Sequence, residues 1–143
     1  MLPDLDVLGF TFGIHYGHFL GHRGFTHSLV FAAAVALAGT FTLARGGHSL
    51  RALTWVYLFL ATASHAVLDA LTNGGLGVAF FAPFDNGRYF FPFTPIDVSP
   101  IGISFFTARG LSVLANELVW IWLPSVVVAT GSSLLWRART RRA

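Results

Sequence analysis

The sequence predicts an all-α integral membrane protein with three transmembrane helices, forming a single membrane-embedded domain over residues 1–143. Hydrophobic residues make up 55% of the chain and charged residues only 10%, which leaves too little polar surface to cover a water-soluble globule. Long apolar runs alternate with stretches rich in glycine and proline. Because lipid offers no hydrogen bonds to an open sheet edge, helices are the expected form of these runs.

Residues 1–27 are expected to form a polar segment ahead of the first span. Five glycines between positions 9 and 24 disfavour a continuous helix there, and four histidines fall in the same segment. The N-terminus shows no basic stretch followed by an apolar run, so a cleaved signal peptide is not expected.

The spans are expected at the longest apolar runs. These runs cover residues 28–44, 52–72 and 112–136. The first is uncharged and close to the lower limit of about 17 residues for a crossing. The second carries His65 and Asp69 near its end. The third carries Glu117 near its start and Pro124 in its middle, where a kink is expected.

A long loop rich in glycine, proline and phenylalanine, over about 72–112, is expected between the second and third spans. Its prolines disfavour long regular elements, because proline cannot donate a backbone hydrogen bond. They occupy positions 83, 92, 95 and 100. The tripeptide at 85–87, Asp-Asn-Gly, is typical of a turn.

The arginines predict the orientation in the lipid bilayer. Arg45 and Arg51 flank a tight loop, and four arginines lie in a basic tail at 137–143. Short arginine-rich segments stay cytoplasmic, so this multi-pass chain is expected to have its loop and its C-terminus in the cytoplasm. No basic face is interleaved with aromatic residues elsewhere, so nucleic acid is not expected as a partner.

This orientation brings polar residues from distant segments to one membrane face. They are Asp4, Asp6, His22, His27, His65, Asp69 and Glu117. An ionisable side chain inside a span costs roughly 2.5–3.5 kcal/mol, so such residues need partners or a function. His65 and Asp69, four residues apart, share one helix face. In a simpler interpretation, this pair only joins two helices by a hydrogen bond and His27 only begins a helix.

The mixture of imidazoles and carboxylates suits a divalent metal ion. Zn²⁺, Mn²⁺ or iron accepts such ligands, whereas Ca²⁺ prefers oxygen ligands alone. The chain has no cysteine, so thiolate ligands are excluded. Three histidines and up to four carboxylates exceed the four places of one zinc, which leaves open one ion with supporting carboxylates or two ions.

Four motifs in order carry a family resemblance. They are Leu2-Pro3-Asp4-Leu5-Asp6, His22-Arg23-Gly24-Phe25-Thr26-His27-Ser28, the segment from Ser64 to Gly75 that contains His65 and Asp69, and Pro83-Phe84 followed by Arg88-Tyr89-Phe90-Phe91-Pro92. With these motifs the chain resembles the YdjM-like family of membrane-bound metal-dependent hydrolases. The resemblance covers most of the chain and implies a bacterial or archaeal protein of the inner (plasma) membrane. Family members usually carry a further apolar helix ahead of the first motif, whereas here Met1 directly precedes Leu2-Pro3-Asp4.

The functional hypothesis is a membrane-bound hydrolase that cleaves an ester or phosphoester of a small-molecule or lipid substrate at the outer face, with zinc or manganese as cofactor. The expected metal ligands are Asp4, Asp6, His22, His27, His65 and Asp69. Asp6 or Glu117 is the expected general base, and Arg23 or Arg88 is expected to hold the substrate anion. The alternative is a non-catalytic membrane protein that binds or conducts a cation or proton through the same residues.

Overall fold

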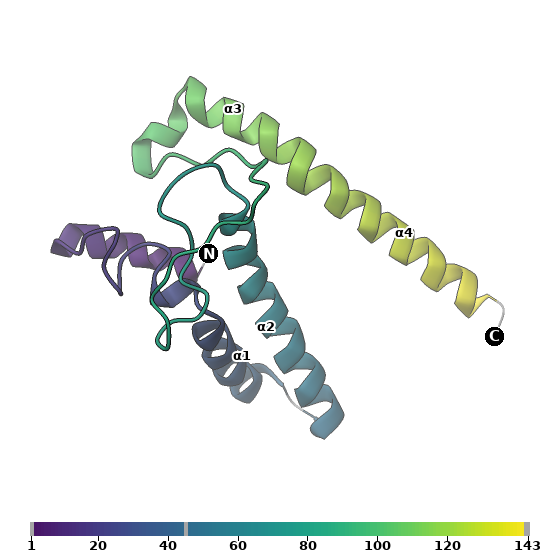
Figure 1. Cartoon of the computed structure of the whole chain (residues 1–143). Coiled ribbons are helices and arrows are strands. Elements are labelled where there is room, and N and C mark those ends of the chain that lie inside the picture. The colour runs from purple at the N-terminus through teal and green to yellow at the C-terminus, as the bar shows by residue number, and fades with distance from the viewer. Residues whose placement is uncertain (1, 45, 142–143) are drawn as a thin grey trace. The chain divides into compact units, whose positions relative to one another are not determined.

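Figure 1 shows the chain as a computed structural model, which describes residues 2–44 and 46–141. The all-helical class is confirmed, since every named element in these residues is a helix. Val78 and Tyr89 form an isolated antiparallel bridge outside any named strand. Contacts divide the chain into two compact units, Met1–Thr94 and Pro95–Ala143, each of which is described by itself. The single domain expected from the sequence stays a prediction.

The first unit contains two 3₁₀ helices followed by two α-helices. Their bounds are Pro3–Phe12 for η1, Phe25–His27 for η2, Leu29–Leu43 for α1 and His48–Ala70 for α2. The glycine-rich sequence does not predict η1. Pro3 opens this helix, where a missing N–H is tolerated, and Gly13 ends it in a left-handed conformation with φ 77°.

Helix α1 begins directly after η2. Ser28 is its N-cap, and Ser28 Oγ accepts a hydrogen bond from Phe31 N at 3.0 Å. Ala32, Ala36 and Thr40 are buried and lie four residues apart, so a stripe of small side chains runs along one face. With 15 residues α1 rises about 22 Å, which is less than the roughly 30 Å thickness of a bilayer's hydrocarbon core.

Helices α1 and α2 pack against each other as an antiparallel pair (Figure 1). A Cβ at Gly39 of α1 would stand 2.7 Å from Leu58 Cδ1 of α2, so the absent side chain allows the close approach. At the far end of α2, Ala66 and Ala70 are buried against Val78 of the following loop. The antiparallel arrangement brings the start of α1 and the end of α2 to the same end of the pair.

The interpretation of residues 45–51 as a loop is wrong from His48 onward. His48 begins the first turn of α2, and Gly47 is the residue that caps it. Arg51 N donates a hydrogen bond to Gly47 O at 3.2 Å, so Arg51 belongs to the helix. The physical reason is that no residue from His48 to Arg51 disfavours a helix once the glycines have turned the chain. Arg45 lies outside the described residues.

The loop after α2 folds back onto the polar N-terminal segment. Val78 and Tyr89 exchange backbone hydrogen bonds of 2.9 and 3.0 Å, and the expected turn at 85–87 lies between them. Ala79 N donates to Arg23 O at 3.0 Å. The loop is therefore joined to the segment that carries the candidate histidines.

The second unit consists of a 3₁₀ helix followed by one long helix with a π-helical turn. Their bounds are Gly102–Phe106 for η3, Ala108–Glu117 for α3, Leu118–Trp122 for the π-helical turn η4 and Leu123–Thr140 for α4. Pro124 is the second residue of α4, one residue after the end of the π turn. Since proline has no N–H and its ring crowds the carbonyl four residues back, a wider turn accommodates it.

The long helix exceeds the predicted span at both ends. It begins at Ala108 rather than at residue 112, so the end of the expected loop is helical. Arg137 and Arg139 form part of the last turn of α4 instead of a separate tail. Cations at a helix C-terminus complement the negative end of the helix dipole, which favours this extension. Arg142 lies outside the described residues.

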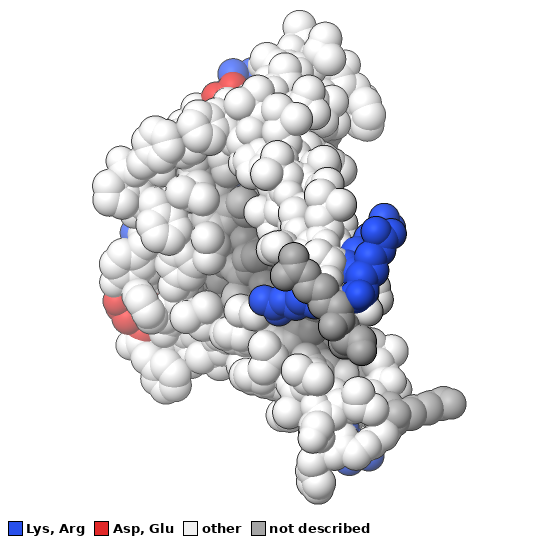
Figure 2. Space-filling view, turned by 90° about the vertical axis from the view of Figure 1, so that its right-hand side faces the viewer, with Lys and Arg blue, Asp and Glu red and all other residues white. Residues whose placement is uncertain are grey.

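Two helices of the described chain are long and apolar enough to cross a membrane. They are His48–Ala70 and Ala108–Thr140. Only 11% and 0% of their apolar windows are buried inside the protein. Figure 2 shows a face on which uncharged side chains predominate and charged ones are sparse. Apolar surface of this extent marks contact with lipid or with another protein.

Candidate metal centre

Four side chains of the first unit, here called the quartet, converge at the end of the α1–α2 pair. They are Asp4 of η1, His27 of η2, and His65 and Asp69 of α2. His65 Nε2 lies 3.0 Å from Asp4 Oδ1 and 3.5 Å from Asp69 Oδ2. His27 Nε2 lies 3.5 Å from Asp4 Oδ1 and 3.1 Å from Asp69 Oδ2. One atom from each side chain therefore faces a common point, and these atoms all lie within 4.8 Å of one another.

Local helix geometry places the members of the quartet. One turn of α2 separates His65 from Asp69, so both side chains leave the same face. His27 is the last residue of η2, directly before the cap of α1. In a 3₁₀ helix a separation of two residues corresponds to a rotation of about 240°, so Asp4 and Asp6 leave η1 on different sides. Asp4 lies near Nε2 of His27 and Asp6 near Nδ1.

The distances between the ligand atoms of the quartet can be compared with those of a tetrahedral metal site. With metal–ligand bonds of about 2.0–2.1 Å, the ligand atoms of a tetrahedron stand roughly 3.3–3.4 Å apart. Four of the six separations run from 3.0 to 3.5 Å, and all six are within 4.8 Å. His27 Nε2 and Asp69 Oδ2 are buried and have no hydrogen-bond partner in the described structure, although they lie 3.1 Å apart. A shared cation would satisfy both atoms.

Asp6 lies behind the quartet and orients His27. Asp6 Oδ2 accepts hydrogen bonds from Thr26 Oγ1 at 2.6 Å and from Arg23 N at 3.2 Å. The same oxygen lies 3.2 Å from His27 Nδ1, while Asp6 Oδ1 lies 2.8 Å from His22 Nδ1. A proton on His27 Nδ1 therefore faces an acceptor, which leaves Nε2 for the quartet. Ligating histidines are commonly held by a carboxylate in this way.

The structure brings all six expected ligands into one cluster but divides them into two groups. Four form the quartet, while Asp6 and His22 form a second group with His27. The sequence reasoning missed Thr26, which bonds Asp6, and Thr72, which bonds Arg23. Both lie within the motifs, but nothing in their spacing distinguishes a supporting hydroxyl from an ordinary one.

The residues expected to act on substrate are placed as follows. Arg88 donates to the backbone oxygens of His22 at 2.9 Å and of Tyr16 at 3.1 Å, so it joins the loop to the polar segment. Arg23 is buried and donates to a carboxylate of the quartet. Glu117 is the last residue of α3, in the second unit. The substrate and base roles of these residues stay predictions.

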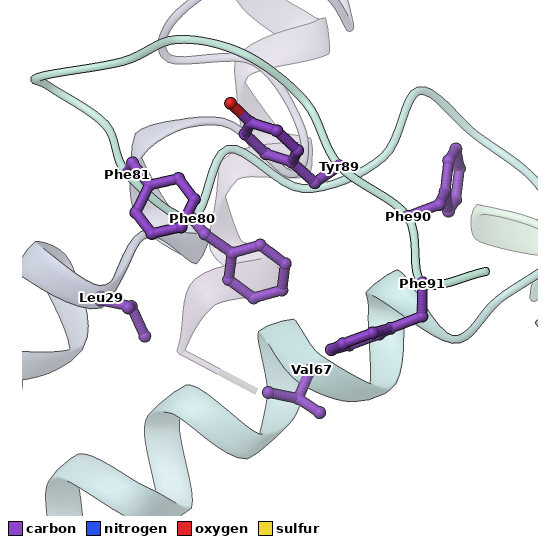
Figure 3. A pocket seen from close by; sticks show the side chains of 7 residues that line it. All are labelled: Leu29, Val67, Phe80, Phe81, Tyr89, Phe90 and Phe91. Carbon is purple, nitrogen blue, oxygen red and sulfur yellow. The ribbon is translucent and has the colours of Figure 1, made fainter. Parts of the chain in front are cut away.

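An apolar pocket of about 360 Å³ lies in the same unit as the quartet (Figure 3). Its walls are Leu29, Val67, Phe80, Phe81, Tyr89, Phe90 and Phe91. Val67 lies two residues from both His65 and Asp69 along α2, so it leaves the helix on a different face from the quartet. The pocket therefore contributes apolar surface to the unit and no ligand to the quartet.

Attraction between the histidines and the carboxylates sets the protonation states in the cluster. Burial lowers the pKa of His27, but the carboxylates of Asp4, Asp6 and Asp69 outweigh burial and raise it to about 10. Burial raises the pKa of Asp4 and of Asp6, yet their hydrogen bonds to histidines hold both values well below the usual range. Without metal, His27 is therefore protonated at neutral pH and both carboxylates are ionised.

Metal binding is expected to release a proton from His27, because a ligating nitrogen must be deprotonated. The affinity for Zn²⁺ should therefore rise between about pH 6 and pH 9, with release of about one proton per ion at pH 7. Calorimetric titration in two buffers of different ionisation enthalpy measures this number. An affinity that does not change with pH would contradict His27 as a ligand.

The same pKa shift predicts how the metal-free fold responds to pH. The pKa of His27 in the folded chain, about 10, exceeds its ordinary value of 6.5. The stabilising contribution of His27 is therefore fully present below pH 6.5 and is lost as the pH rises towards 10. Thermal unfolding of the metal-free protein across this range measures the loss, which bound metal should reduce.

Charge balance favours one divalent ion over two. With neutral histidines, the carboxylates of Asp4, Asp6 and Asp69 and the guanidinium of Arg23 leave an excess of two negative charges. One divalent cation neutralises this excess, whereas two would leave an uncompensated positive charge in a largely buried site.

Long apolar helices and a His/Asp cluster at the end of a helix pair define a helical membrane protein with a group of side chains that could hold a metal ion. Residues 1–141 match the family described as YdjM inner membrane protein, and the chain belongs to that family. The resemblance seen in the motifs is thereby confirmed.

A relative supports the same assignment. The chain is 43% identical over 140 residues to the inner membrane protein YbcI of Escherichia coli (strain K12). The alignment covers 97% of this chain and 80% of the relative. No solved structure matches the chain. The inner-membrane location expected from the sequence therefore agrees with both the family and this relative.

Proposed function

We propose that the chain is a metal-dependent hydrolase of the inner membrane that cleaves an ester or phosphoester of a small-molecule or lipid substrate. The observation that carries the proposal is the buried pair formed by His27 Nε2 and Asp69 Oδ2, which lack hydrogen-bond partners in the described structure and face the same point as Asp4 and His65. Leaving buried polar atoms without a hydrogen bond costs free energy, and a bound cation would remove that cost.

The quartet would hold the ion, for which zinc or manganese is suited. Such an ion, when bound, acts as a Lewis acid that polarises a carbonyl or phosphoryl oxygen and lowers the pKa of water. The side chain of Asp4 is 36% exposed, against 0% for His27 and 16% for Asp69. Within the first unit, the substrate would therefore reach the quartet from the side of Asp4.

Asp6 serves this proposal as a support for His27 more readily than as a general base. Its side chain is 1% exposed, and it is enclosed by Thr26, His22 and the backbone of Arg23. A general base must come within hydrogen-bond reach of the substrate or its water, which the burial of Asp6 opposes. Glu117 lies in the second unit, so its role as a base stays an expectation from the sequence.

Metal analysis and hydrolysis assays on detergent-purified protein test the proposal. Wild-type protein should bind about one Zn²⁺ or Mn²⁺ per chain and release acid from an ester or phosphoester panel. His65→Ala should lose both properties, since it removes a quartet ligand. His48→Ala is the matched control, because His48 begins the same helix at the opposite end. A wild-type chain that binds neither metal would overturn the proposal.

A second candidate function is non-catalytic binding of a cation. Four protein ligands can fill a tetrahedral shell, which is typical of structural zinc sites, whereas catalytic sites usually keep one place for water. Stoichiometric metal with no hydrolysis of any tested ester or phosphoester, in wild-type protein at several pH values, would favour this function.

The proposed orientation places the quartet at the outer face and the C-terminus in the cytoplasm. It requires that α1 crosses the membrane despite its 15 residues, together with α2 and the helix over 108–140. Arg137 and Arg139 should then hold the end of α4 inside. Fusions of a cytoplasm-active reporter and an export-active reporter to the C-terminus test this orientation. If only the export-active fusion were active, the C-terminus would lie outside and the proposed orientation would be wrong.

A further inference from the structure

Arg23 has an unusual backbone for a residue with a side chain. Its φ is 62°, and in the described chain every other residue with positive φ is glycine. Non-glycine residues in this region cost free energy, so neighbouring contacts must hold them there. For Arg23 these contacts are a hydrogen bond from its N–H to Asp6 Oδ2 at 3.2 Å and one from Ala79 N to its carbonyl oxygen at 3.0 Å.

The side chain of Arg23 reaches the end of α2 on the other side. Nη2 donates to Asp69 Oδ1 at 3.0 Å, and Nη1 donates to Asp69 O at 3.3 Å. Nη1 also donates to Thr72 Oγ1 and to Gly74 O, both at 2.9 Å. The residue is only 3% exposed. Its two terminal nitrogens are therefore engaged within the protein.

The space around the guanidinium is closed. A Cβ at Gly75 would stand 3.1 Å from Arg23 Nη1 and 2.6 Å from Tyr16 Oη, and the φ of Gly75 is 89°. A glycine is required here both for its backbone and for the room it leaves. The guanidinium therefore has little freedom to swing towards a substrate.

Arg23 contacts two carboxylates of the cluster, one inside the quartet and one beside it. Arg23 holds Asp69 by Oδ1, while Asp69 Oδ2 belongs to the quartet. The backbone N–H of Arg23 donates to Asp6 Oδ2, and this oxygen also lies 3.2 Å from His27 Nδ1. One residue thus restrains a quartet carboxylate directly and a quartet histidine through Asp6.

We propose that Arg23 is a positioning residue of the metal centre, which sets the orientation of Asp69 and His27, instead of a group that holds a substrate anion. The inference rests on the proposed function, because it presupposes that the quartet binds a metal ion. A purely structural ion pair would stabilise the end of α2 without changing the metal affinity or the ligand geometry.

The test compares Arg23→Gln, Arg23→Lys and Arg88→Gln in full-length detergent-purified protein. Zn²⁺ affinity is measured by competition with a chelator, and the visible spectrum of the Co²⁺-loaded protein reports the ligand geometry. Arg23→Gln should lower Zn²⁺ affinity roughly 10–100-fold and shift the Co²⁺ bands at saturation. Arg23→Lys keeps the charge without the planar fork, so it should recover only part of the affinity.

Arg88→Gln is the matched control. It also removes a guanidinium that holds the polar segment, but Arg88 donates to backbone oxygens and to no quartet carboxylate. It should keep the wild-type Co²⁺ spectrum. Should Arg23→Gln fail to fold, Thr72→Val serves in its place. It removes one acceptor of Arg23, together with the hydrogen bond that Thr72 Oγ1 donates to Asp69 O at 2.7 Å, and should give a smaller loss of affinity with the same spectral shift.

The outcomes separate the two proposals. If wild-type protein binds Zn²⁺ and the Arg23 variants match Arg88→Gln in affinity and spectrum, the positioning role is overturned and the proposed function stands. If wild-type protein binds neither Zn²⁺ nor Co²⁺, the proposed function fails and the positioning role fails with it.

Discussion

His27→Ala is expected to abolish tight metal binding. The variant removes the buried ligand nitrogen that lies 3.5 Å from Asp4 Oδ1 and 3.1 Å from Asp69 Oδ2. The remaining carboxylates would face one another across a cavity without the imidazole between them. The loss should exceed the roughly 100-fold upper end seen when a supporting group is removed, because a ligand itself is lost.

Zn²⁺ competition against a chelator and metal content after dialysis measure this effect. His15→Ala is the matched control, since His15 lies in the same polar segment and is exposed. It should retain wild-type affinity. Full metal stoichiometry in His27→Ala protein would remove His27 from the ligand set, whatever the fold of the variant.

Asp69→Asn is expected to destabilise the metal-free protein strongly and also to weaken metal binding. Its charge pairs with Arg23, whose side chain is only 4% exposed, at a distance of 3.0 Å. Removing one partner of a buried ion pair leaves the other charge uncompensated, which typically costs about 3–5 kcal/mol. The amide keeps the size of the carboxylate, so the effect reports charge more than packing.

Chemical unfolding in detergent, followed without metal and again with Zn²⁺, measures the free energy of unfolding. Asp97→Asn supplies a comparison within the same chain, because Asp97 pairs with the half-exposed Arg109 at 3.8 Å. An exposed pair of this kind contributes no more than about 1 kcal/mol. Equal losses of stability in the two variants would show that the Arg23–Asp69 pair contributes no more to the free energy of unfolding than an exposed pair does.

The α2 segment shows what sequence reasoning can reach. Its apolar run and the spacing of His65 and Asp69 predict both the helix and the shared face, because hydropathy and helical periodicity are local properties. The start of the helix at His48 was beyond such reasoning, since a basic turn and the first turn of a helix have compatible compositions.

The polar segment shows where that reasoning stops. The sequence marks His22 and His27 alike as ligand candidates, and it marks Asp4 and Asp6 alike. The structure separates them: His27 and Asp4 belong to the quartet, whereas His22 and Asp6 lie behind it. A glycine-rich chain has no periodic pattern from which its path can be predicted, so the distinction depends on contacts with α2 and the following loop.

By itself the sequence determined that the chain is helical, that it is a membrane protein and which polar residues are candidates, because composition, hydropathy and short motifs carry this information. Only the tertiary structure decided which atoms converge and that Arg23 is turned inward to Asp69. The reason is physical: the quartet joins residues up to 65 positions apart, and their distances follow from helix packing and a left-handed Arg23 backbone rather than from spacing along the chain.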